Sequence, residues 1–286
     1  MVAGYSYHNA NVLYGTYSYQ YQRLFTLAIA FSTALVTAMI PAISSALAIG
    51  DNKLLKHRIN ESYKAIYIVT IPSIAGITFL AHPIISLIWF DLKAGGSDLV
   101  AFGAWTAILM TIQYVQTSIL IAMGKPVIAS VNQIIGMAVK VLLNYVLIAI
   151  PSINIRGAII GTAVGWLIAI ILNQHAIRPI FTFKIYFIRL MFKPAVVSVV
   201  MGVCCYLVYN GVAKLLFLIM QENVPYLLLS DIALFVAVVA GIIIYFTLMI
   251  KIKGVTKNDI VRLPMGGRIY RLATKIPFLS EDLEAK

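Results

Sequence analysis

The stretch Asn11–Ser44, NVLYGTYSYQYQRLFTLAIAFSTALVTAMIPAIS, decides the fold of this chain. It begins polar and rich in tyrosine, carries one cation at Arg23, and then runs apolar with small residues as far as Pro41. Apolar runs of about 20 residues indicate membrane-spanning helices rather than the ~10-residue alternating strands of a barrel. A cation in such a helix costs roughly 2.5 kcal/mol or more near the bilayer centre, so we expect Arg23 to have a function or a partner.

The composition extends this prediction to the whole chain. Of its 286 residues, 61% are hydrophobic and 11% are charged, whereas soluble domains average about 45–50% and about 25%. The sequence therefore predicts an all-α integral membrane protein. Cys204 and Cys205 are adjacent in an apolar run, and we expect them to pack rather than to form a disulfide or a metal site. Residues 1–22 lack the basic start and apolar core of a signal peptide.

The hydrophobic pattern predicts a bundle of about seven transmembrane helices within residues 1–250, followed by a basic cytoplasmic tail at 251–286. The expected helices cover about 19–48, 65–90, 99–123, 127–150, 157–172, 194–220 and 226–250. The charged segment 51–64 is expected to be a loop. The tyrosine-rich residues 1–18 and the basic, aromatic segment 173–193 are expected to lie at the membrane surface.

The positions of lysine and arginine predict the orientation of the helices. If the loop after the first helix is cytoplasmic, the cytoplasmic segments together hold 17 of the 22 cations. Because cytoplasmic loops carry an excess of Lys and Arg, we expect the N-terminus outside and the C-terminus in the cytoplasm. The same rule accounts for the net charge of +12 without nucleic acid. An odd helix count with an external N-terminus and no signal peptide suggests that an N-terminal part is missing.

The titratable residues do not predict an enzyme. All ten carboxylates lie in expected loops, helix ends or the tail, and the four histidines show no metal-ligand spacing. The sequence has no Gly-rich phosphate loop and no nucleophile motif, so we expect no cofactor and no metal. An alternative, head-group chemistry by Asp91, Asp98 and His82 at the outer surface, does not fill the roles of a catalytic site.

Polar residues within the expected spans are the candidate binding residues. Asn132, Gly136, Lys140 and Asn144 follow one another at four-residue spacing, which places them on one helix face. Lys140 lies about 20 Å from the cytoplasmic end by helical rise, too deep to snorkel easily. It either meets an anionic substrate on a transport path or makes a polar contact with a neighbouring helix. Arg23 either reaches head-group phosphates or faces a cavity and binds phosphate through its planar guanidinium.

Four segments in order resemble those of polysaccharide exporters. LYGTYSYQYQRLFTLAIAFSTALVTAMIPAISSALAIGD, residues 13–51, resembles the start of the C-terminal half of the multidrug/oligosaccharidyl-lipid/polysaccharide exporter superfamily. PSIAGITFLAHPIISLIW (72–89), KVLLNYVLIAIPSINIRGAIIGTAVGW (140–166) and DIVRLPMGGRIYRLATKIPFL (259–279) are similar to segments of its stage V sporulation protein B-like group, which is related to the lipid II flippases.

The resemblance implies a fourteen-helix fold of two six-helix lobes and two extra helices, of which this chain supplies the last seven. It implies a flippase that moves an undecaprenyl-pyrophosphate-linked oligosaccharide, a precursor of peptidoglycan or of another surface polysaccharide, across the bacterial plasma membrane by alternating access. Arg23 and Lys140 would meet the pyrophosphate, and Asn132 and Asn144 the sugars.

The expected partners are the lipid-linked substrate, membrane lipids and either a missing N-terminal half or a second copy of the chain. Two alternatives stay open at this point. One is a cation-coupled multidrug exporter of the same superfamily, and the other is a non-transporting membrane partner of polysaccharide synthases.

Overall fold

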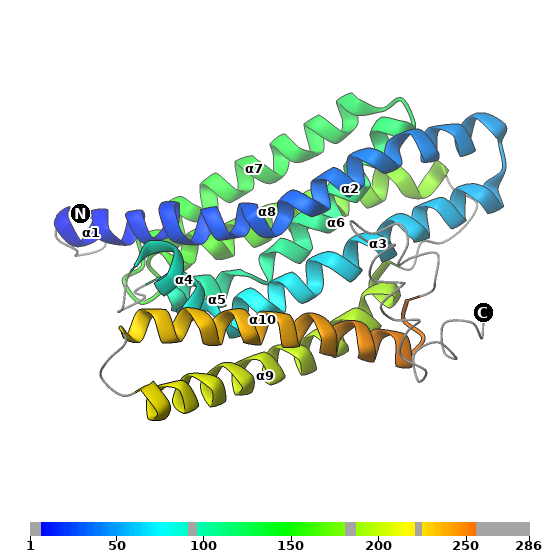
Figure 1. Cartoon of the computed structure of the whole chain (residues 1–286). Coiled ribbons are helices and arrows are strands. Elements are labelled where there is room, and N and C mark those ends of the chain that lie inside the picture. The colour runs from blue at the N-terminus through cyan, green and yellow to red at the C-terminus, as the bar shows by residue number, and fades with distance from the viewer. Residues whose placement is uncertain (1–6, 91–95, 181–186, 221–224, 256–286) are drawn as a thin grey trace.

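The computed structural model describes residues 7–90, 96–180, 187–220 and 225–255, which form a bundle of long helices without β-strands (Figure 1). Six of these helices are long and apolar enough to cross a membrane, and a bent pair makes a seventh if it is one span. The predicted all-α membrane bundle of about seven spans is therefore confirmed. The tail beyond residue 255 lies outside the described residues.

The first span is the end of a nearly continuous helix. α1 (Tyr7–Gly15) passes through the π-helical segment η1 (Thr16–Tyr21) into α2 (Gln22–Ile49). The lead-in expected at the membrane surface is thus helical from Tyr7 onward. α2 ends at Gly50, whose φ of 73° is a left-handed conformation that glycine adopts without a Cβ clash.

The charged segment 51–64, expected to be a loop, is helical, so that prediction was wrong. The Asp51 carboxylate accepts hydrogen bonds from two backbone N–H groups, at 2.8 and 3.1 Å, and so caps α3 (Asn52–Phe79). The segment is amphipathic, and its charged residues alternate with apolar ones that are buried against α2 and α6. The buried side chains at four-residue spacing are Leu55, Ile59 and Tyr63.

Two of the expected spans are divided. The chain breaks at Leu80, between α3 and α4 (Ala81–Trp89). α5 (Ser97–Gly103) and α6 (Thr106–Ala122) meet at an angle of 43°. Both breaks fall near the same end of the bundle (Figure 1).

The remaining spans follow the expected ranges more closely, as α7 (Pro126–Ile148), α8 (Arg156–Ile177), α9 (Phe187–Met220) and α10 (Tyr226–Lys251). The segment 173–193, expected along the membrane surface, instead largely extends the spans on either side of it. α8 continues into the short 3-10 helix η2 (Arg178–Ile180), and α9 begins at Phe187. Residues 181–186 are not described.

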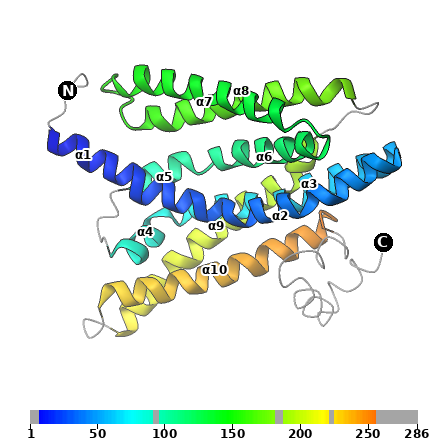
Figure 2. The same cartoon turned by 90° about the horizontal axis from the view of Figure 1, so that it is seen from above.

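The helices are arranged in layers. Figure 2 shows α7 and α8 on one side, α9 and α10 on the other, and α2, α3 and α6 between them. The largest cluster of buried side chains joins these three central helices, with Ile43, Ile59 and Ile119 among its fully buried members. Hydroxyl groups add polar links, because Ser32 on α2 bonds with Thr70 on α3. These contacts fix one face of α2 inside the bundle and leave the opposite face exposed.

Candidate substrate path

Helices α7 and α8 meet along a seam of small and polar residues. On α8 these residues recur at every fourth position and comprise Gly157, Gly161, Gly165, Ala169 and Asn173. A Cβ placed on Gly165 would lie 2.6 Å from the carbonyl oxygen of Gly136 and 3.0 Å from the Cβ of Lys140. The two backbones approach so closely because the residues between them are small, as is common between transmembrane helices.

The two asparagines expected to bind sugars lie in this seam. The Asn132 Nδ2 donates a hydrogen bond to the Asn173 Oδ1 at 2.9 Å, and Asn132 is only 8% exposed. The Asn144 Oδ1 lies against Gly161 and has no hydrogen-bond partner among the described residues. Both side chains therefore lie at the interface between α7 and α8, and their binding of sugars stays a prediction.

The two candidate cations lie on different surfaces. Lys140 is partly exposed on α7, with its Cβ against α8 in the seam. Arg23 lies on the exposed face of α2. Neither belongs to an ion pair within the described part of the chain. The structure therefore brings Lys140 together with Asn132 and Asn144 along one face of α7 and leaves Arg23 apart from them.

The exposed face of α2 carries a second set of polar and small residues, which we call the α2 stripe. Its members, spaced alternately by three and four residues, are Arg23, Thr26, Ala30, Thr33 and Thr37. All of them are exposed, apart from Thr33, which is half-buried. The hydroxyls of Thr26 and Thr37 donate to carbonyl oxygens one turn earlier, at 2.8 and 2.9 Å. The stripe thus presents small hydroxyl groups along a helix that begins with one guanidinium.

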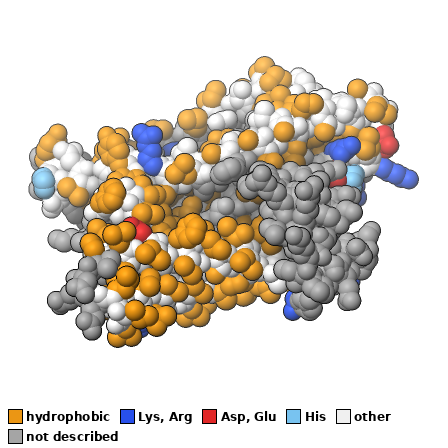
Figure 3. Space-filling model, in the orientation of Figure 1, with side chains coloured by type: hydrophobic (Ala, Val, Ile, Leu, Met, Phe, Trp, Pro, Cys, Tyr) orange, Lys and Arg blue, Asp and Glu red, His pale blue; other side chains and the backbone are white. Residues whose placement is uncertain are grey.

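Elsewhere the long helices expose aliphatic side chains. The outer face of α7 carries large exposed residues, namely Val127, Ile134, Val141, Leu142 and Val146. α9 and α10 do the same, and Figure 3 shows hydrophobic side chains gathered over them. Because acyl chains solvate aliphatic groups well and leave a guanidinium without partners, the aliphatic faces suit lipid and the Arg23 end of the α2 stripe suits water.

Arg23 was predicted from the sequence as a candidate binding residue, but the threonines that follow it were not. Their signal was present, because Thr26, Thr33 and Thr37 continue the helical spacing of three and four from Arg23. Nothing in that spacing says whether a neighbouring helix covers the face. Only the packing of α2 on α3 and α6 shows that it is left open.

An aromatic stack joins the start of α2 to α8. Tyr17 and Tyr21 stack at 5.4 Å between ring centroids, Tyr21 meets Phe25 at 5.6 Å, and Phe25 stacks on Trp166 of α8 at 5.6 Å. The Tyr21 hydroxyl also hydrogen-bonds with the Thr106 Oγ1 at 3.0 Å. Tyr17 and Tyr21 are buried in these contacts and hold the end of the α2 stripe that carries Arg23 in place.

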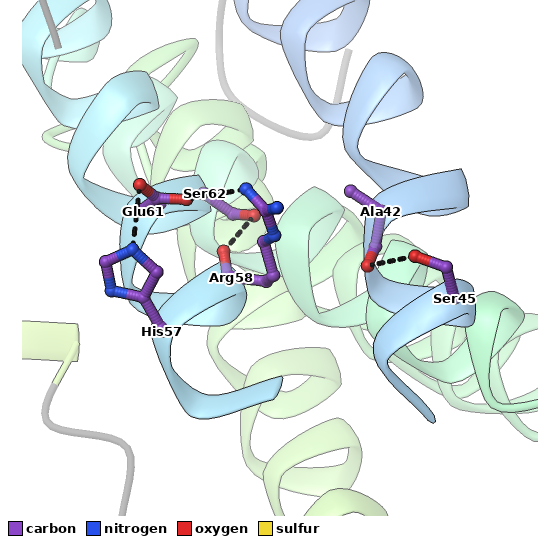
Figure 4. A network of polar contacts seen from close by, with 6 residues as sticks. All are labelled: Ala42, Ser45, His57, Arg58, Glu61 and Ser62. Carbon is purple, nitrogen blue, oxygen red and sulfur yellow. Dashed lines mark hydrogen bonds and ion pairs between the residues drawn. The ribbon is translucent and has the colours of Figure 1, made fainter. Parts of the chain in front are cut away.

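A charged network lies at the other end of the stripe, where α2 turns into α3 (Figure 4). The Glu61 carboxylate pairs with His57 Nε2 at 3.1 Å and with Arg58 at 3.3 Å. On the neighbouring turn of α2, the Ser45 hydroxyl donates to the Ala42 carbonyl at 3.1 Å. Glu61 thus moderates the positive charge of the first turns of α3. Among the described residues, no three His, Cys, Asp or Glu side chains group as a metal site.

The fold and its surfaces define a class of protein. This is a multi-span helical membrane protein whose long helices expose mostly aliphatic side chains, with one arginine and several threonines aligned on the exposed face of α2. Transporters line a hydrated path with polar faces of part of their helices. A family model described as "Lipid II flippase MurJ" matches residues 12–224. Because the match covers most of the chain, the chain belongs to the lipid II flippase MurJ family.

Curated relatives agree with this assignment. The lipid II flippase MurJ of Bacillus subtilis (strain 168) is 28% identical over 190 residues, covering 64% of this chain and 34% of the relative. Stage V sporulation protein B of the same strain is 22% identical over 271 residues, covering 94% of this chain and 49% of the relative. The predicted resemblance is thereby confirmed. The chain spans about a third to a half of the length of these relatives, and no solved structure matches it.

Proposed function

We propose that this chain forms the C-terminal part of a flippase that moves an undecaprenyl-pyrophosphate-linked oligosaccharide across a bacterial plasma membrane. Membership of the family supports a lipid-linked precursor as the cargo. The observation that carries the proposed path is the α2 stripe, because Arg23 and the threonines line up along an exposed face of a long apolar helix. The family's activity is one of transport rather than of catalysis, at the level of the family.

In this proposal the α2 stripe contacts the polar head group of the substrate, and the aliphatic faces contact its lipid tail. The pyrophosphate and sugars pass along the stripe, where Arg23 offers two parallel N–H groups to a phosphate and the threonines offer hydroxyls to sugars. Ala30 keeps the middle of the path wide. The polyprenyl tail stays in the bilayer, beside aliphatic faces such as that of α7.

A hydrated path needs a second wall opposite the α2 stripe. In the proposed mechanism this wall belongs to another lobe, supplied by an N-terminal half or by a second copy, and the two lobes alternate between openings to either side. The N-terminus of this chain lies outside and its C-terminus lies in the cytoplasm. A separate proposal concerns α7, which lies apart from the stripe: Lys140 would meet the pyrophosphate at mid-membrane, and Asn132 and Asn144 would meet the sugars.

The test is Arg23→Ala in cells that depend on this protein for translocation. A charge-assisted hydrogen bond contributes about 1.5–3 kcal/mol, so the variant should slow head-group translocation roughly tenfold to a hundredfold. Translocation is read as the fraction of precursor that a membrane-impermeant reagent labels. Lys214→Ala, which removes an exposed cation from α9, is the control and should give the wild-type labelled fraction of precursor.

Two further variants sharpen this test. Arg23→Lys should keep only part of the activity, because an ammonium cannot form the two parallel bonds of a guanidinium. Lys140→Ala should abolish complementation while the protein still inserts. A wild-type labelled fraction in Arg23→Ala would contradict the assignment of the path to the α2 stripe.

A further inference from the structure

A groove with a volume of about 540 Å³ lies between α6, α8 and the start of α9, away from the α2 stripe. Aliphatic side chains of α6 and α8 form its walls, and Phe187, Ile188 and Met191 of α9 close one side. Gln174, His175 and Arg178 line the end where α8 stops. The groove thus has an apolar length and a polar, basic end.

Its length matches one leaflet of a bilayer. Along α8 the groove runs from Leu167 to Arg178, which is about 17 Å of helical rise. Half of a hydrocarbon core of about 30 Å is about 15 Å. A groove of this length, with its basic end at the end of a span, places that end at head-group depth.

Within the part of the chain that the structure describes, the charges at this end are not balanced by an acidic side chain in the groove. His175 and Arg178 are both exposed, and no carboxylate is among the described residues that line the groove. The nearby Lys193 is engaged elsewhere, because its Nζ donates to the backbone carbonyls of Ile252 and Lys253 at 3.0 and 3.3 Å. Gln174 accepts a hydrogen bond from the Gln116 Nε2 at 3.1 Å, which fixes the polar end to α6.

A second groove of similar size provides a comparison. It measures about 480 Å³ and lies between α3, α4, α9 and α10, with Leu27 of α2 also lining it, and Tyr245 and Ser73 are among its few polar residues. No charged residue is among those that line it. Of these two grooves among the described residues, the one between α6, α8 and α9 combines apolar walls with a cationic end.

We propose that this groove binds an anionic glycerophospholipid of the surrounding bilayer, with an acyl chain along α8 and the phosphate at Arg178 and His175. The guanidinium suits a phosphate because it offers paired donors, and basic pockets between spans attract acidic head groups. An undecaprenyl chain is far longer than one leaflet, so a phospholipid acyl chain fits the groove better. The site is separate from the proposed substrate path and does not depend on it.

Native mass spectrometry of the purified chain in detergent tests the proposal, with dioleoyl phosphatidylglycerol and dioleoyl phosphatidylcholine as probes. Phosphatidylglycerol should bind more tightly. Arg178→Ala should weaken it about fivefold, the equivalent of one cation near an acidic head group. Lys125→Ala, an exposed cation outside the groove, should leave its binding unchanged.

A second pair of variants tests the groove independently of its charge. Ile171→Trp fills the groove from an exposed position and should lower phosphatidylglycerol binding, whereas Ile134→Trp on the outer face of α7 should not. Thermal unfolding of each variant confirms that it is folded. Equal binding of the two phospholipids, unchanged binding in Arg178→Ala, or displacement of phosphatidylglycerol by equimolar undecaprenyl phosphate would each overturn the proposal.

Discussion

The α7–α8 seam and the α2 stripe carry similar residues in opposite surroundings. Both repeat polar or small side chains every three or four positions along one helix face. In the seam, α8 supplies glycines that let the backbones meet, and Asn173 that pairs with Asn132. On the stripe, the described helices leave Arg23 and Thr37 exposed. A polar helix face thus forms a helix–helix contact where a neighbour offers small residues, and stays exposed where none does.

The largest expected effect comes from overfilling the seam. Gly165→Leu forces a side chain against the Gly136 carbonyl oxygen, which lies 2.6 Å from the position of its Cβ. Because the obstacle is backbone, the helices must separate, and we expect a loss of about 3 kcal/mol in the free energy of unfolding. Denaturant unfolding in mild detergent, followed by helical circular dichroism, measures it.

A glycine outside the seam provides the matched control. A Cβ on Gly211 of α9 would meet nothing within 4 Å. Gly211→Ala should therefore stabilise the protein slightly, by about 0.5–1 kcal/mol, through the higher helix propensity of alanine. If Gly165→Leu unfolded at the same denaturant concentration as Gly211→Ala, the described contact between α7 and α8 would be wrong.

A smaller effect is expected from the polar pair of the seam. Asn132→Ala leaves the Asn173 Oδ1 without its donor, which should cost about 1 kcal/mol. Asn210→Ala is the control, since the Asn210 Nδ2 bonds only to the Tyr206 carbonyl of its own helix, at 2.8 Å on an exposed face. A double-mutant cycle with Asn173→Ala should give a coupling of roughly 0.6–1.7 kcal/mol, and zero coupling would rule out the pair.

The smallest effect on stability is expected on the stripe. The hydroxyl of Thr37 bonds only to its own helix and is exposed, so Thr37→Val should change the free energy of unfolding by less than about 0.5 kcal/mol. It should nevertheless slow translocation, because it removes a hydroxyl from the proposed path. If Thr37→Val unfolded at a clearly lower denaturant concentration and still transported normally, the α2 stripe would serve stability rather than transport, which contradicts the proposal.

Most of the fold followed from hydrophobic runs, because the bilayer admits few alternatives to long helices. The helical start of α3 was not predicted, because its charged residues interrupt the hydrophobic run although the segment is amphipathic. Leu55, Ile59 and Tyr63 recur every four residues and are buried, although the segment around them is too polar to read as a span. The break at Leu80 lies three residues before Pro83, a residue type that breaks or kinks helices, and no proline lies at the bend between α5 and α6.

The candidate site was predicted in part. Four-residue spacing correctly placed Asn132, Lys140 and Asn144 on one face of α7, but it could not identify what covers that face. The matching spacing on α8, from Gly157 through Gly161 to Asn173, was also in the sequence. Reading both helices together predicts a close seam, since only small residues permit such an approach.

The most direct test of the account is the exposure of the α2 stripe to water. Single cysteines at Thr26, Thr33 and Thr37, in a background with Cys204 and Cys205 replaced by alanine, are compared with a cysteine at Val141 on the outer face of α7. A membrane-impermeant thiol reagent needs the thiolate, which forms in water and not in lipid. The account predicts at least tenfold faster labelling along the stripe than at Val141, and equally slow labelling at all four positions would contradict it.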